Sequence, residues 1–136
     1  ISLRTWNNLD SKYWSKYGIG SALLEKYNVA PLSDYALSKT LEDGSEKELH
    51  ITQDLCYGYF DKSGTLFKIY NPRSKTCKFF KVKTHVQGQD QLSYDVPNLA
   101  ICSSMKDGLC FSLLGISGYE WAAPCSENTT IPEKIM

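Results

Sequence analysis

The chain has 136 residues, of which 42% are hydrophobic and 12% aromatic, and its formal net charge is zero. This composition indicates a globular domain with an apolar core, and the neutral total excludes a protein drawn to nucleic acid by its overall charge. No apolar run approaches the ~20 residues that a membrane span needs, so we expect no membrane partner. The five cysteines form no Cys-x-x-Cys pair, which disfavours a zinc site and fits buried thiols in a reducing cytoplasm.

Two short helices are expected in residues 1–35. Asp10 or Ser11 can cap the first helix, because each has a side-chain oxygen that can accept a hydrogen bond from a free backbone N–H group. Ser21 can cap the second helix in the same way, and Asn28 can end it. These signals predict a compact helical hairpin at the start of the chain.

The next part of the chain changes from a polar loop to a small sheet. Residues 39–50 are polar and acidic and contain a glycine, which favours a loop. Residues 55–60, 65–70 and 77–83 follow the two-residue period of strands, and the turn at 61–64 ends in glycine. We therefore predict a meander of three antiparallel strands.

The last part shows the pattern of a β-α-β unit. A Gln-rich polar stretch, residues 86–95, is the expected linker, and an apolar strand follows at 99–102. A helix is expected to begin at Ser104 and end at Gly115, before a second strand at 119–123. Two strands joined by a helix are expected to pair in parallel.

These elements predict an α+β fold with a helical hairpin, a three-stranded antiparallel meander and the start of an α/β sheet. We expect two domains. Residues 1–95 form the helical and basic-sheet domain, and residues 96–136 form an incomplete α/β domain. An ordinary β-α-β start with no functional site fits the same pattern.

Positive charge is concentrated in residues 62–83. This stretch holds seven of the fifteen basic residues and no acidic residue, and Tyr70, Phe79 and Phe80 lie among the cations. Cations interleaved with rings can bind a phosphate backbone and stack on its bases, so the stretch indicates a nucleic-acid surface. The candidate contacts are Lys68, Arg73, Lys75, Lys78, Lys81 and Lys83. A plain half-solvated sheet shows similar alternation and is the alternative.

Five motifs together resemble phage-type DNA primases. They are Tyr13-Trp14, Tyr17-Gly-Ile19, Lys68-Ile-Tyr-Asn-Pro72, Ser103-Ser-Met-Lys-Asp107 and Ala123-Pro-Cys-Ser-Glu127. The resemblance implies part of a primase RNA-polymerase domain, in which a template-binding basic subdomain precedes a TOPRIM domain, the catalytic α/β fold of bacterial-type primases. It also implies single-stranded DNA, nucleoside triphosphates and a replicative helicase as partners, in the cytoplasm of a bacterial or phage-infected cell.

The resemblance also implies a catalytic site, from which this sequence departs. TOPRIM domains hold Mg²⁺ with a glutamate on the first strand and an Asp-x-Asp motif on a later strand. Here Ser103 takes the glutamate position, and the chain contains no Asp-x-Asp. Asp107 and Glu127 are the candidate catalytic acids, and Glu127 is the candidate Mg²⁺ ligand. Lys106 is a candidate phosphate contact or the partner of Asp107 in a surface ion pair.

Glu127 by itself cannot hold the two metal ions that primer synthesis needs. We therefore expect no primer synthesis from these residues alone. Two other classes of function stay open. The chain can be a non-catalytic nucleic-acid-binding module with a TOPRIM-like remnant. It can also be an interaction domain whose lysine-rich sheet binds an acidic protein surface and no single strand.

Overall fold

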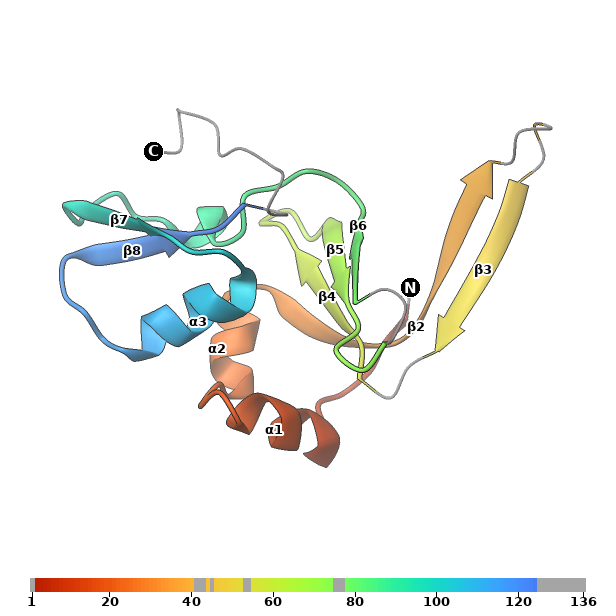
Figure 1. The fold of residues 1–136 in the computed structure, drawn as a ribbon, viewed down its shortest axis with the longest axis horizontal. Helices are drawn as coiled ribbons and strands as arrows, with labels where there is room; N and C mark the ends of the chain where they lie inside the picture. Colours follow the sequence, from red (N-terminus) through yellow and green to blue (C-terminus); the bar gives the residue numbers. More distant parts are fainter. Residues whose placement is uncertain (1, 41–43, 45, 53–54, 75–77, 125–136) are drawn as a thin grey trace.

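The computed structural model describes residues 2–40, 44, 46–52, 55–74 and 78–124 (Figure 1). In chain order, its elements are β1 (Ser2–Leu3), α1 (Asn8–Ser15), α2 (Ser21–Lys26), β2 (Val29–Thr40), β3 (Glu46–Thr52), β4 (Tyr57–Phe60), β5 (Leu66–Tyr70), β6 (Phe79–Lys81), the 3-10 helix η1 (Gln89–Gln91), β7 (Asn98–Ile101), α3 (Met105–Leu113) and β8 (Tyr119–Ala122). The fold is mixed α+β, as the sequence predicts. Among the described residues, no helix is long and apolar enough to cross a membrane.

Six strands form one antiparallel sheet in the order β1-β2-β4-β5-β6, and β3 pairs with the outer part of β2. The predicted meander is confirmed as β4, β5 and β6. It is part of a larger sheet, because β2 also pairs with β4. The third strand is shorter than the predicted 77–83, since the N–H groups of Val82 and Lys83 both donate to the Phe67 carbonyl.

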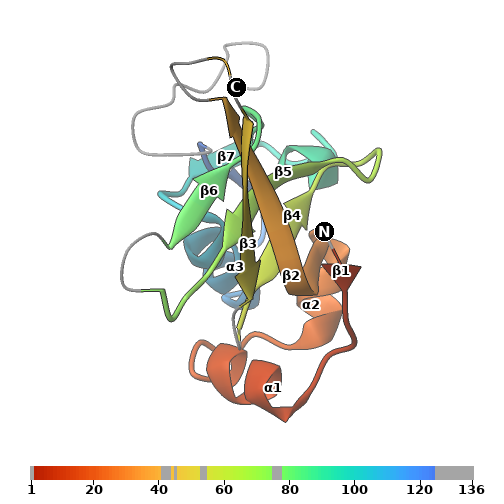
Figure 2. The ribbon, with the colours of Figure 1, turned by 90° about the vertical axis from the view of Figure 1, so that its right-hand side faces the viewer.

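The polar loop predicted at residues 39–50 is wrong at both of its ends, because residues 39–40 lie in β2 and residues 46–50 lie in β3. β2 and β3 form a long antiparallel hairpin there, and Figures 1 and 2 show it reaching beyond the other strands. Tyr35 pairs with Ile51 and Leu37 pairs with Leu49. The alternation of these apolar residues is a strand signal, but the charged residues around them made the stretch look like a loop. The helical assignment of residues 1–35 also fails at its end, because β2 begins at Val29.

The two predicted short helices are confirmed as α1 and α2, but they do not pack as a compact hairpin, and Figure 1 shows them crossing steeply. Other residues than predicted cap them. Asn7 is the N-cap of α1, and its side chain accepts hydrogen bonds from two N–H groups of the first turn at 3.0 and 3.1 Å. Asp10 lies inside the helix and completes a capping box by accepting from the Asn7 N–H at 2.9 Å. Gly20 precedes α2 and makes no side-chain cap, so Ser21 is the first helical residue rather than the cap.

Asn7→Ala is expected to lower the free energy of unfolding by about 1 kcal/mol, because two N–H groups lose their acceptor. Urea denaturation monitored by circular dichroism measures this loss. The control is Asn8→Ala, which changes an exposed neighbour outside the cap and is expected to stay within about 0.5 kcal/mol of the parent. Equal losses in the two variants would contradict the assignment of the cap.

The predicted β-α-β unit is confirmed. β7 and β8 pair in parallel from Asn98–Tyr119 to Ile101–Ala122, and α3 connects them. Ser104 caps α3 by accepting from the Asp107 N–H at 3.2 Å, and Gly115 follows the helix with a φ of +63°. The carboxylate of Asp107 accepts instead from the hydroxyl of Ser103, so it does not complete a capping box.

One core cluster joins α1, α2, the meander and the β-α-β unit. Its buried members include Trp14, Leu24, Tyr57, Leu109 and Trp121. The stretch predicted as a linker packs against this body, because Gln87 is fully buried and exchanges two backbone hydrogen bonds with Ala123 at 2.8 and 2.9 Å. The division into domains at residues 95 and 96 stays a prediction.

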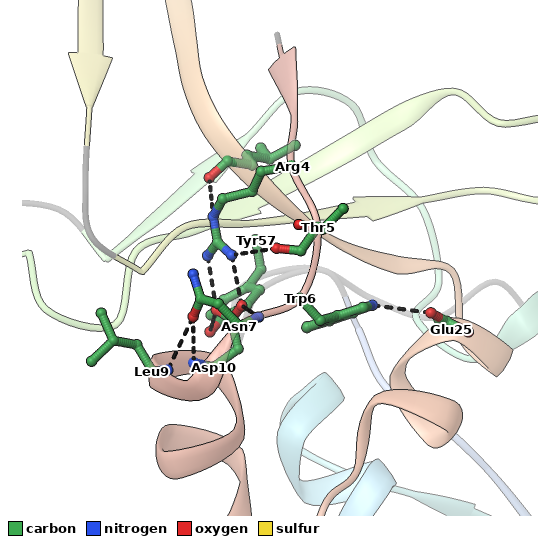
Figure 3. A network of polar contacts seen from close by, with 9 residues as sticks. Arg4, Thr5, Trp6, Asn7, Leu9, Asp10, Glu25 and Tyr57 are labelled. Carbon is green, nitrogen blue, oxygen red and sulfur yellow. Dashed lines mark hydrogen bonds and ion pairs between the residues drawn. The ribbon is translucent and has the colours of Figure 1, made fainter.

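A buried ion pair fastens the N-terminal segment to α1 and β4 (Figure 3). The Arg4 guanidinium donates to both carboxylate oxygens of Asp10 at 2.6 and 2.8 Å, and the Tyr57 hydroxyl donates to one of them at 2.7 Å. Asp10 is 1% exposed. Its burial alone would raise its pKa, but the hydrogen bonds from Arg4, Tyr57 and the Asn7 N–H outweigh burial and lower that pKa.

Candidate nucleic-acid interface

The edge strand β6 carries an exposed ring with cations near it in the chain. Phe79 is 43% exposed and stacks on Tyr70, with ring centroids 4.7 Å apart and planes 14° from parallel. Arg73, Lys78 and Lys81 are exposed, and the two-residue period of a strand places Phe79 and Lys81 on one face. Arg73 and Lys78 lie outside β6, near it in the chain. Arg73, Lys78, Phe79 and Lys81 are together named the β6 surface.

Lys68 lies on the neighbouring strand β5, where it is paired with Lys81. The residue is 7% exposed, and its ammonium group is 4.4 Å from the centroid of the Phe79 ring. A cation held against a ring face stabilises the position of that ring. Lys68 therefore supports Phe79 and offers little surface to a phosphate. Phe80, also predicted among the cations, packs instead on the core cluster that contains Leu32 and Ile69.

Two other predicted contacts lie outside the β6 surface. Lys83 pairs with Asp61, with 2.5 Å between Nζ and Oδ2. The hydrogen bond from Lys83 is the main cause that lowers the pKa of Asp61, so this carboxylate is ionised and offsets the charge of Lys83. Lys75 lies outside the described residues.

A series of rings leads from the β6 surface across α1. Tyr70 lies 6.3 Å from Tyr13, and Tyr13 lies 5.8 Å from Tyr17, between ring centroids. The hydroxyls of Tyr13 and Tyr70 are hydrogen-bonded, and Tyr17 is 37% exposed. Phe79, Tyr70, Tyr13 and Tyr17 are named the aromatic series. Sequence reasoning did not assign Tyr13 and Tyr17 to a site, although their four-residue spacing places them on one side of a helix.

Cations lie along this series as well. The Lys16 ammonium is 5.4 Å from the Tyr13 ring centroid, and the Lys106 ammonium is 4.5 Å from that of Tyr17. Burial raises the pKa of Tyr13 and of the neighbouring Tyr57, so both hydroxyls stay protonated at neutral pH. The Tyr13 ring therefore adds no negative charge that would repel a phosphate.

The aromatic series ends at the start of α3, where Asp107, one of the two predicted catalytic acids, lies. Lys106 contacts Tyr17, and the exposed Asp107 accepts a hydrogen bond from Ser103. Lys106 is thus a neighbour of the aromatic series, as a phosphate contact would need to be. Glu127 lies outside the described residues.

The described residues do not assemble a metal site. Within the part of the chain that the structure describes, no three His, Cys, Asp or Glu side chains come together as a metal cluster. The start of α3 contributes one carboxylate, Asp107, and the serine hydroxyls beside it are weak ligands for Mg²⁺. The residues seen here therefore do not fit a Mg²⁺ site by themselves.

Comparison with known proteins adds no relative. No family model, no curated protein and no solved structure matches the chain. The geometry of the β6 surface and the aromatic series is therefore the remaining guide to function.

Proposed function

We propose that the chain binds single-stranded nucleic acid along the β6 surface and the aromatic series. The observation that carries this proposal is the exposed ring of Phe79, which stacks on Tyr70. Tyr70 in turn contacts Tyr13, and Tyr13 contacts Tyr17. An exposed ring can stack on an unpaired base of any sequence, and lysine or arginine beside it can bind the phosphates. Bases within a duplex are already stacked on each other, so this surface favours single strands.

The proposal extends to a primase-like role, in which this chain holds the template. Two features support it: the parallel β7-α3-β8 unit that the resemblance to TOPRIM domains implies, and the contact of Lys106 with Tyr17. A strand on the aromatic series would approach the start of α3, where Ser103 and Asp107 lie. Nucleoside triphosphates, Mg²⁺ and a replicative helicase would then act with the complete domain in the cytoplasm, with Glu127 as the candidate ligand of the metal.

Fluorescence anisotropy with a labelled oligothymidylate of about 15 nucleotides tests the proposal. Affinity is expected to fall steeply between about 50 and 200 mM salt. Removing two phosphate contacts in the double variant Lys78→Ala, Lys81→Ala should reduce the slope of log K against log salt by about 1.4. Phe79→Ala should weaken binding about tenfold at an unchanged slope, because it removes stacking and no charge.

Lys62→Ala is the matched control, since Lys62 is an exposed lysine of the same basic stretch but lies on the β4–β5 turn. Its binding and salt slope are expected to match those of the parent chain. Equal affinity for duplex and single strand would contradict the stacking role of Phe79. An unchanged slope in the Lys78 and Lys81 variant would exclude the β6 surface as the interface. No binding of the oligothymidylate at all would favour the interaction-domain alternative.

A further inference from the structure

A pocket of about 270 Å³ lies between the C-terminal ends of α2 and α3, the segment around η1 and the start of β8. Its lining includes Lys26, Tyr27, Phe111, Ser112, Tyr119 and Trp121. No residue of the β6 surface or the aromatic series lines this α3-end pocket. Ser103 and Asp107 are at the other end of α3, a nine-residue helix that is about 13 Å long.

The pocket has a rigid aromatic floor. Trp121 is 3% exposed and stacks on Tyr27, with ring centroids 5.0 Å apart and planes 28° from parallel. Gly108 of α3 lies so close to the indole that a Cβ placed on it would be 2.1 Å from a ring carbon. The same distance for Gly88 is 2.9 Å. Because the indole is held on several sides, the floor keeps its shape before a ligand binds.

The floor presents an unused hydrogen-bond donor. The indole Nε1–H of Trp121 donates to the Ser112 hydroxyl at 2.7 Å and to the Tyr27 hydroxyl at 3.1 Å. The two hydroxyl oxygens are 3.3 Å apart, so one can donate to the other. They carry two protons, and only one can lie between them. The other proton has no acceptor among the described residues, and it is available to a ligand.

Two charged residues, Glu120 and Lys26, line the pocket, and they differ in their hydrogen bonds and exposure. The carboxylate of Glu120 already accepts from the N–H groups of Ser93 and Tyr94 at 2.7 and 2.9 Å. The side chain of Lys26 is exposed, with its ammonium 5.9 Å from the centroid of the Tyr27 ring. An anionic group at the rim would therefore meet Lys26, while the aromatic part of the same ligand occupied the interior.

We propose that the α3-end pocket binds a nucleoside monophosphate, with its base against the aromatic side chains and its phosphate at Lys26. The volume is close to the ~300 Å³ at which small-molecule sites begin, which suits a nucleotide better than a larger cofactor. A ring nitrogen or carbonyl oxygen of the base accepts the free hydroxyl proton of Tyr27 or Ser112. The exposed ring of Tyr119 supplies a further stacking partner. This site is independent of the proposed interface.

Two-dimensional ¹H–¹⁵N NMR with adenosine monophosphate tests this proposal, with the indole signal of Trp121 identified from Trp121→Phe. Saturable movement of that signal is expected. Ser112→Ala should weaken binding about fivefold through loss of one hydrogen-bonding group. Tyr119→Ala should weaken it about tenfold through loss of stacking. Ser117→Ala is the control, because Ser117 is an exposed serine between α3 and β8 that does not line the pocket. This variant should bind as the parent does.

Inorganic phosphate alone is expected to leave the Trp121 signal in place, and an equal shift would overturn the role of the base. The proposal is also overturned if adenosine monophosphate gives no saturable shift, or if Ser112→Ala and Tyr119→Ala bind it as the parent does. The same chemistry occurs in a free nucleotide and in one nucleotide of a strand. If a strand supplies the base, Tyr119→Ala also weakens oligothymidylate binding. If a free nucleotide does, Tyr119→Ala leaves oligothymidylate binding unchanged.

Discussion

Arg4→Ala is expected to lower the free energy of unfolding by about 3–5 kcal/mol, because it leaves a buried carboxylate without its cation. Asp10 is 1% exposed and accepts two hydrogen bonds from Arg4, at 2.6 and 2.8 Å (Figure 3). Without Arg4, the carboxylate keeps only the Tyr57 hydroxyl and the Asn7 N–H as donors in the network. Urea denaturation at neutral pH measures the loss.

A double-mutant cycle separates the ion pair from the packing of the arginine. The variant Arg4→Met with Asp10→Asn removes both charges, and it should be less destabilised than the sum of its two single variants. Lys12→Ala, an exposed cation on the same helix, is the control and should change stability by less than about 0.5 kcal/mol. Additive losses in the cycle would show that Arg4 and Asp10 act separately.

The pH dependence of stability follows from the same network. Because the folded state lowers the pKa of Asp10, its contribution to stability is fully present above the unfolded pKa of about 3.9. That contribution is lost as the pH falls through the lower, folded pKa. In Arg4→Ala the folded pKa should rise, so acid unfolding should begin at a higher pH than in the parent chain.

Gly108→Ala is expected to lower the free energy of unfolding by about 2–3 kcal/mol. Gly108 lies inside α3, where alanine would ordinarily stabilise a helix by about 1 kcal/mol. Here, however, the new Cβ would be 2.1, 2.2 and 2.4 Å from three carbons of the Trp121 ring. The ring is buried against Tyr27 and cannot move away freely, so the overlap outweighs the helix preference.

Thermal and urea denaturation measure this effect, and a smaller residue at position 121 tests its cause. In a Trp121→Leu background, Gly108→Ala should be neutral or slightly stabilising, since the overlapping ring is gone. Gly20→Ala is the control, because nothing lies within 4 Å of a Cβ at that position, and its cost should stay below about 1 kcal/mol. An equal loss in both backgrounds would show that Trp121 is not the obstacle.

Sequence patterns alone predicted the elements whose signals are local. The turn at 61–64 follows from an aspartate and a glycine at fixed positions, and it joins the predicted strands β4 and β5. The β7-α3-β8 unit follows from two short apolar runs around a helix with a serine cap. The hairpin of β2 and β3 was missed, because its polar and charged residues outweighed a short apolar alternation.

Only the tertiary structure decided which of the predicted residues can form a site. Lysines look alike in a sequence, but Lys68 is buried with its ammonium group near the Phe79 ring, Lys83 is paired with Asp61, and Lys81 is exposed. The aromatic series and the α3-end pocket join residues far apart in the chain, such as Tyr13 with Tyr70 and Tyr27 with Trp121. Exposure and such contacts depend on how elements pack together, and a local pattern of residue types does not contain that information.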